Sequence, residues 1–103
     1  MQIDIRSLHF TAKPELITFV TEKVKGLSHF NDRIIAADVH LKLENADNKE
    51  NKICEIKLIV PGNDLFAERR SNSFEESIAH VLEALEKQLR KEKTKEQNRN
   101  HGK

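Results

Sequence analysis

Aromatic residues are scarce in this 103-residue chain, which has no tryptophan, no tyrosine and only five phenylalanines. A buried core must therefore be mainly aliphatic, and a sheet cannot carry the stacking aromatics that single-strand RNA readers use. Cys54 is the single cysteine, so no intramolecular disulfide can form. No apolar run approaches the ~18 residues that span a bilayer, and residues 1–6 lack the pattern of a signal peptide. These absences predict a cytoplasmic protein with no membrane partner.

Residues that carry chemistry are equally sparse. The three glycines, Gly26, Gly62 and Gly102, are isolated, so they cannot form a glycine-rich loop that cradles a phosphate. The histidines show no i, i+4 pair and one cysteine supplies at most one thiolate, which leaves no zinc motif. There is no nucleophile elbow, and acids such as Glu55 and Glu68 fall on predicted exposed strand faces. We therefore predict a protein that is not an enzyme, with no catalytic residues, no metal, no cofactor and no small-molecule substrate.

Charge is distributed unevenly along the chain. Residues 87–103 contain seven lysines or arginines and two glutamates, a local net charge of +5, whereas the whole chain carries only +1. The preceding residues therefore sum to −4. A basic segment on a nearly neutral protein is typical of a polyanion-binding surface, because each lysine or arginine that meets a phosphate releases a condensed counterion. Nucleic acid is the predicted partner.

Hydrophobic periodicity predicts four strands and two helices. Apolar and polar residues alternate in four segments, and apolar residues recur at three- and four-residue spacing in two others. Pro14 suits a first helical turn, and Ser73 is a good N-cap followed by Glu75 and Glu76. The predicted strands cover residues 2–8, 35–44, 54–60 and 65–70, and the helices start at residues 14 and 73.

This order is β-α-β-β-β-α, which indicates an α+β fold. A helical crossover makes the first two strands parallel and short turns make the others antiparallel, so we expect a four-stranded mixed sheet with both helices on one face. Leu89 is the last large apolar residue, so the core should end there. Residues 1–95 are predicted to form a single domain whose second helix projects to about Lys95. Residues 96–103 are predicted to be a flexible basic tail.

The basic end of the second predicted helix is the main candidate binding site. Lys87, Lys91 and Lys95 lie four residues apart and thus on one stripe, with Arg90 beside it. Successive phosphates would align with such a ridge. The alternative is that these cations only complement the helix dipole and keep an exposed helix end soluble. Their density exceeds what one last turn requires, which favours the binding interpretation.

Three segments resemble the ribosome hibernation-promoting factors, a family also called ribosome-associated inhibitor or sigma-modulation proteins. They are FVTEKVKGLSHFNDRI at residues 19–34, VHLKLE at residues 39–44 and SFEESIAHVLEALEKQLRKEKTK at residues 73–95. The likeness covers residues 1–95 in the same element order. Its specific features are DRI after the first helix and QL followed by alternating lysines. The second helix departs from the family's common Asp-Met-Tyr-Ala-Ala-Ile start, and Ala84 stands where a basic residue is often found.

The resemblance implies a fold similar to a double-stranded RNA-binding domain with an extra N-terminal strand. It implies binding to the small ribosomal subunit near the decoding region, which blocks mRNA and tRNA access and inhibits translation in stationary phase or stress. It also implies a short form, so that ribosome dimerisation would need a separate factor. Family members use basic residues of both helices against ribosomal RNA. The matching residues here are Lys23, Lys25, Lys87, Lys91, Lys93 and Lys95, and Arg90 joins them on the charge pattern.

Two other functions fit the same residues. A protein-interaction regulator of the sigma-factor-modulation type would dock the basic helix end on an acidic partner protein. A general double-stranded RNA-binding module would share the predicted topology and would bind arbitrary duplexes. Nuclease treatment separates the first of these from ribosome binding, because only an RNA-dependent association disappears when RNA is digested.

Overall fold

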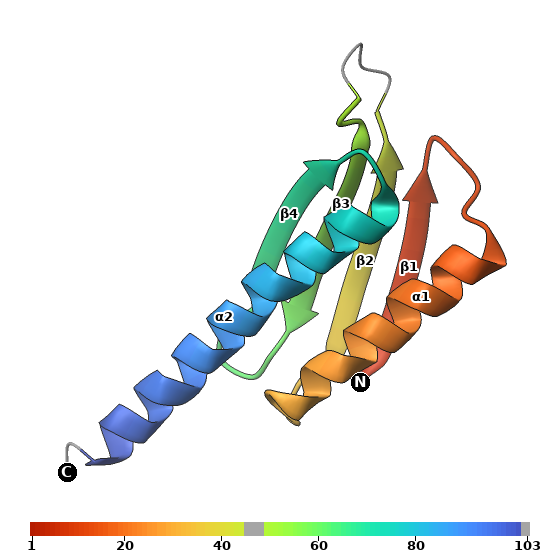
Figure 1. Ribbon diagram of the computed structural model, residues 1–103. Coiled ribbons are helices and arrows are strands. Elements are labelled where there is room, and N and C mark those ends of the chain that lie inside the picture. Colours follow the sequence, from red (N-terminus) through yellow and green to blue (C-terminus); the bar gives the residue numbers. More distant parts are fainter. Residues whose placement is uncertain (45–48, 102–103) are drawn as a thin grey trace.

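The computed structural model describes the backbone of residues 1–44 and 49–101, and side chains within these ranges up to residue 92. Strands and helices follow one another in the predicted order β-α-β-β-β-α, with one short 3-10 helix added (Figure 1). The elements are β1 (Gln2–Leu8), α1 (Pro14–Lys25), the 3-10 helix η1 (Gly26–His29), β2 (Ala36–Leu43), β3 (Lys52–Ile59), β4 (Leu65–Ser71) and α2 (Phe74–His101).

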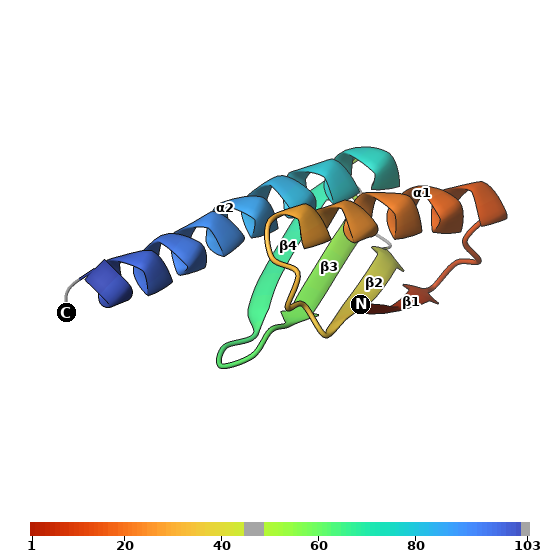
Figure 2. The ribbon, with the colours of Figure 1, turned by 90° about the horizontal axis from the view of Figure 1, so that it is seen from below.

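The strands form one mixed sheet in the order β1-β2-β3-β4. β1 and β2 are parallel because α1 provides the crossover between them, whereas β3 and β4 are added as antiparallel neighbours. Both helices pack on the same face of this sheet, which is seen most clearly from below in Figure 2. The predicted α+β architecture is therefore confirmed.

Burial follows the two-residue period of the strands. In β2 and β3 the side chains that face the helices are buried, among them Val39, Leu41 and Ile56, while their neighbours point to the other face. The apolar stripe of α2 covers them. It consists of Phe74, Ile78, Val81, Leu85 and Leu89. Leu89 is only 1% exposed, so the core extends to the residue at which the sequence predicted its end.

Polar contacts hold the start of α2. The Ser73 hydroxyl accepts a hydrogen bond from the backbone N–H of Glu76 at 3.2 Å, as expected for an N-cap. Ser77 is completely buried; its hydroxyl donates to the carbonyl of Lys52 at 2.6 Å and lies 2.9 Å from the Ser71 hydroxyl. Since Lys52 lies in β3 and Ser71 in β4, these contacts anchor α2 across two strands.

Several element ends differ from the predictions by one or two residues, α2 is longer than predicted, and a 3-10 turn that was not predicted follows α1. The chain leaves α1 at Lys25 and tightens into η1, as helix ends commonly do. β3 starts at Lys52 rather than at Cys54, because the ladder with β2 continues to the end of the hairpin. α2 runs to His101, well past Lys95, because a helix that is already nucleated propagates readily through lysine, glutamate and glutamine. The flexibility of residues 96–103 stays a prediction, and residues 102–103 lie outside the described part of the chain.

Candidate nucleic-acid interface

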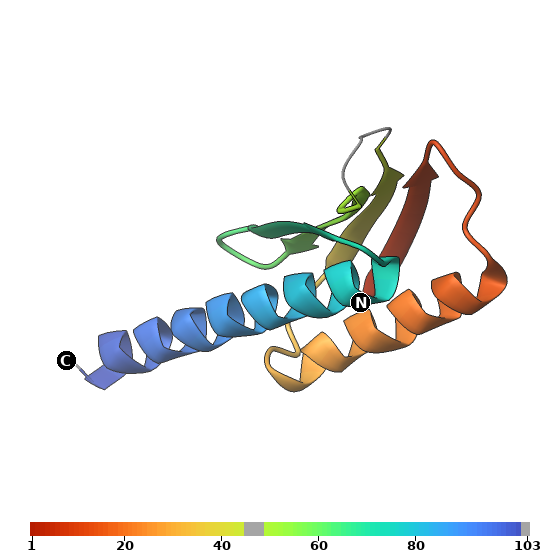
Figure 3. The same ribbon diagram turned by 45° about the horizontal axis from the view of Figure 1, so that its top comes forward.

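The two helices run in the same direction. β1 and β2 are parallel, and β4, two antiparallel steps from β2, points the same way. Each helix returns across the sheet against the strand before it, so α1 and α2 are roughly parallel (Figures 1 and 3). Their C-terminal ends therefore lie toward the same end of the molecule. Cations are favoured there because each helix dipole places partial negative charge at its C-terminus.

Cations of the predicted site gather toward that end of the molecule. Lys23 and Lys25 occupy the last turn of α1, and Lys87, Arg90 and Lys91 lie on the second half of α2. All five side chains are exposed. We call this set the basic end. The other two predicted cations continue the same helix, with side chains outside the described residues: Lys93 and Lys95.

The described cations of α2 spread over about 100° of the helix circumference. Successive residues are rotated by about 100°, so Arg90 lies roughly 60° from Lys87 and 100° from Lys91 around the axis. Lys87 lines a hollow between α2 and β4 together with Arg69. Arg90 points toward the end of α1, where its guanidinium carbon lies 5.3 Å from the centre of the Phe30 ring. Lys87 and Lys91, about 40° apart, are compatible with the predicted stripe, and Arg90 lies beside them on the side of α1.

Two of these cations have carboxylate partners on α2 itself. Lys87 Nζ lies 3.5 Å from Glu83 Oε1, and Arg90 Nη2 lies 2.7 Å from Glu86 Oε1, each at i, i+4 spacing. The lysine and arginine side chains are nevertheless 75% and 66% exposed. Exposed pairs of this spacing contribute only about 0.3–0.5 kcal/mol, so a phosphate can replace the carboxylate at small cost. Both cations therefore remain available to an anionic partner.

The remaining cations of the basic end are not neutralised within the described structure. Lys23, Lys25 and Lys91 form no ion pair with any side chain up to residue 92 that the structure describes. Lys23 instead places its ammonium 5.6 Å from the centre of the Phe19 ring, one turn earlier on α1. These three charges face solvent, where they attract anions.

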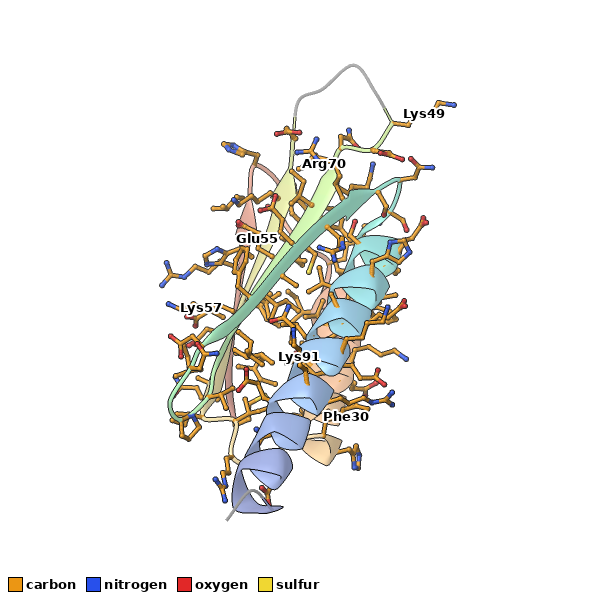
Figure 4. The ribbon with its side chains drawn as sticks, turned by 90° about the vertical axis from the view of Figure 1, so that its left-hand side faces the viewer. Phe30, Lys49, Glu55, Lys57, Arg70 and Lys91 are labelled. Atoms are coloured by element: carbon orange, nitrogen blue, oxygen red, sulfur yellow. The ribbon has the colours of Figure 1, made fainter. Side chains whose placement is uncertain are left out.

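The sheet face away from the helices has a different electrostatic character. Lys42 Nζ lies 2.8 Å from Glu55 Oε2, and Arg70 pairs with Glu44 at 2.8 Å. The hydrogen bond to Glu55 is the main cause of a raised pKa of Lys42. Figure 4 shows Glu55 and Lys57 on the side of the sheet away from α2. Carboxylates slightly outnumber cations on this face, with Asp4, Asp38, Glu44, Glu55 and Glu68 against Arg6, Lys42, Lys57 and Arg70. A polyanion is therefore attracted to the basic end rather than to this face.

Two further arginines lie near the helices and were not predicted as site residues. Arg69 is opposite Cys54 in the β3–β4 ladder and so faces the helices, but at the sheet edge it remains exposed. The alternation that predicted β4 contains this signal. Arg33 lines a second hollow with Phe30 and Leu89, at the end of the sheet. The DRI sequence after the first predicted helix contains Arg33, but its place in the hollow depends on segments distant in sequence.

Metal ligation and thiol reactivity depend on described side chains that lie outside the basic end. Among the described residues, no three histidine, cysteine or acidic side chains are placed to share a metal ion. Cys54 is completely buried, and burial raises the pKa of its thiol to about 12. A neutral, buried thiol is a core side chain rather than a nucleophile. None of the helices in the described ranges combines the length and apolar character that crossing a bilayer requires.

Comparison with known sequences identifies relatives over nearly the whole chain. A family model described as "Sigma 54 modulation protein / S30EA ribosomal protein" matches residues 3–97. A ribosome hibernation promoting factor of Pseudomonas putida is 28% identical over 98 residues, which cover 95% of this chain and 92% of that protein. The factor of Klebsiella oxytoca is 30% identical over 95 residues, covering 92% and 96%. The ribosome hibernation promotion factor of Bacillus subtilis is 30% identical over 97 residues, covering 92% of this chain and 50% of that protein.

Solved structures share the fold. A ribosomal subunit interface protein from Coxiella burnetii superposes with a TM-score of 0.81 at 22% identity, covering 91% of this chain and 99% of that one. The N-terminal domain of Protein Y from Thermus thermophilus gives 0.77 at 22% identity, covering 88% and 98%. These likenesses concern the fold alone, whereas the family match extends over the sheet and both helices. The chain therefore belongs to the family described as sigma 54 modulation protein / S30EA ribosomal protein.

Proposed function

We propose that this chain is a ribosome hibernation factor whose basic end binds the small ribosomal subunit near the decoding region. Relatives in Pseudomonas putida, Klebsiella oxytoca and Bacillus subtilis carry the hibernation factor name. The observation that carries the proposal is the parallel direction of the helices, which brings Lys23 and Lys25 toward the same end as the cations of α2. Ribosomal RNA presents dense phosphate to such a surface.

The proposed mechanism is exclusion. Lysine and arginine contacts to phosphates position a domain without making or breaking a covalent bond. A domain held near the decoding region occupies space that mRNA and tRNA need, so translation stops while it is bound, in stationary phase or stress. This mechanism involves no catalytic step or cofactor and operates in the cytoplasm. Ribosome dimerisation would require a separate factor.

Neutralising part of the basic end tests the proposal. We expect Lys25→Gln, Arg90→Gln and Lys91→Gln together to abolish most co-sedimentation with small ribosomal subunits at moderate salt, because up to three phosphate contacts are lost. The fold should persist, because all three side chains are exposed and lie outside the core. Thermal unfolding of the variant checks this.

A matched control removes the same charge from the opposite face. Arg6→Gln, Lys57→Gln and Arg70→Gln also lower the net charge by three, but they lie on the sheet face away from the helices. This control should sediment with small subunits nearly as well as the unchanged protein. If both triple variants lose binding equally, net charge rather than the basic end governs association, and the proposed interface is incorrect.

A second function is favoured by the family description, which also names sigma 54 modulation. A sigma-modulating domain would use the basic end against an acidic protein surface. Ribonuclease treatment of lysate separates the two functions: loss of association supports ribosome binding, and persistence supports a protein partner. A gel shift with unrelated duplex RNA tests the general double-stranded RNA-binding alternative, which predicts a shift with any duplex.

A further inference from the structure

A hollow of about 370 Å³ adjoins the basic end at the point where α2 leaves the sheet. Its walls come from the segment after α1, the β3–β4 turn and α2. Phe30 is partly exposed and provides apolar surface, while the buried side chains of Leu65 and Leu89 lie behind it in the core. Polar side chains from all three walls surround this surface: His29, Asp32, Arg33, Asn63 and Glu92. A volume of this size, with a few convergent polar groups, is typical of a small-ligand site.

Two polar side chains that line the hollow, Ser28 and Asn31, bond to backbone groups, whereas four others have no such partner. Asp32, Arg33, Asn63 and Glu92 form no side-chain hydrogen bond or ion pair with any residue whose side chain is described. The charged side chains of the sheet face away from the helices differ in this respect, since several of them pair with one another. These four side chains are thus free to meet an external ligand.

The net negative charge of the hollow disfavours a phosphate and favours a neutral ligand that donates hydrogen bonds. Two carboxylates, Asp32 and Glu92, outnumber the single guanidinium of Arg33. Ionised carboxylates only accept hydrogen bonds, so their natural partner is an N–H group. Cytosine, guanine and adenine carry exocyclic amino groups that donate to carboxylates, whereas uracil has no amino group. A planar base would also fit against the apolar surface beside Phe30.

We propose that this hollow receives one unstacked RNA base that bears an exocyclic amino group. The ring lies against Phe30, and the amino group donates to Asp32 or Glu92. The phosphates on either side of the base meet the adjoining basic end, to which Phe30 is linked through Arg90. Proteins read folded RNA mainly through such splayed-out bases. This inference rests on the proposed RNA-binding function and adds base selectivity to it.

Neutralising the two carboxylates of the hollow distinguishes base binding from simple electrostatic attraction. Asp32→Asn combined with Glu92→Gln makes the protein more positive by two charges, so electrostatic attraction alone would tighten binding to small ribosomal subunits. If the hollow holds a base, the same double variant weakens binding about tenfold, because the amino group loses a charged acceptor. The control Asp38→Asn with Glu68→Gln makes the same charge change on the opposite sheet face. It should bind equally well or more tightly.

Nucleotides test the hollow without ribosomes. We expect cytidine monophosphate to shift the backbone amide resonances of residues 31–33 and 63 in the free protein at about tenfold lower concentration than uridine monophosphate, which carries the same phosphate. Equal binding of both nucleotides, or tighter ribosome binding by the double variant, would overturn the base site. A protein that prefers cytidine monophosphate but does not sediment with ribosomes would refute the proposed function and leave the base site standing.

Discussion

Ser77 is the residue whose side chain most directly connects α2 to the sheet. Its buried hydroxyl bonds to the Lys52 carbonyl and lies beside the Ser71 hydroxyl. We expect Ser77→Ala to lower the free energy of unfolding by about 1–3 kcal/mol, because buried polar partners lose their hydrogen bond. Urea unfolding followed by circular dichroism measures this change.

An exposed serine supplies the comparison for Ser77. The Ser28 hydroxyl donates to the Lys25 carbonyl at 2.8 Å, but this contact is exposed and water can replace it. We expect Ser28→Ala to change the free energy of unfolding by less than about 0.5 kcal/mol. Equal effects of the two substitutions would show that burial of Ser77 does not matter for anchoring α2.

In the second half of α2, closely spaced cations favour binding of a polyanion but destabilise the free helix. Lys91, Lys95 and Arg99 follow one another at four-residue spacing, and like charges at this spacing destabilise a helix. A bound polyanion would relieve that repulsion. Lys95→Glu would relieve it as well, because a carboxylate between two cations gains about 0.2–0.5 kcal/mol from each pair.

We therefore expect Lys95→Glu to act in two directions. Amide hydrogen exchange of residues 93–101 in the free protein should slow, while co-sedimentation with small ribosomal subunits should weaken. A variant that exchanges more slowly and also binds more tightly would show that helix order, rather than cationic charge at this position, limits association. The same exchange experiment tests the prediction that residues 96–103 form a flexible tail.

On the scale of the whole molecule, both helices carry lysine or arginine toward the same end. If four to six lysines or arginines neutralise phosphates, the logarithm of the ribosome-binding constant should fall with the logarithm of salt concentration with a slope of about −3 to −5. Binding measured between 50 and 300 mM salt gives this slope, a range chosen to span roughly physiological ionic strength. A slope near zero would mean that phosphate contacts do not drive association.

The amino-acid sequence alone determined the elements and the core. Alternation in the strands and three- and four-residue spacing in the helices predicted the order β-α-β-β-β-α, the mixed sheet and the end of the core at Leu89. Such patterns are reliable because each depends on neighbouring residues and on one face being buried. The excess of cations after Lys87 is equally local. The extent of α2 was underestimated, because a helix continues without core contacts once it has started.

Only the tertiary structure decided how these parts meet. The parallel course of α1 and α2, which places Lys23 and Lys25 toward the cations of α2, follows from strand register and sheet order. The contact of Arg90 with Phe30 and the hollow around Phe30 likewise depend on segments far apart in sequence. Periodicity shows which face of an element is buried but not which neighbour buries it. Long-range packing determines which elements are neighbours, and it therefore determines where the residues of the candidate site lie.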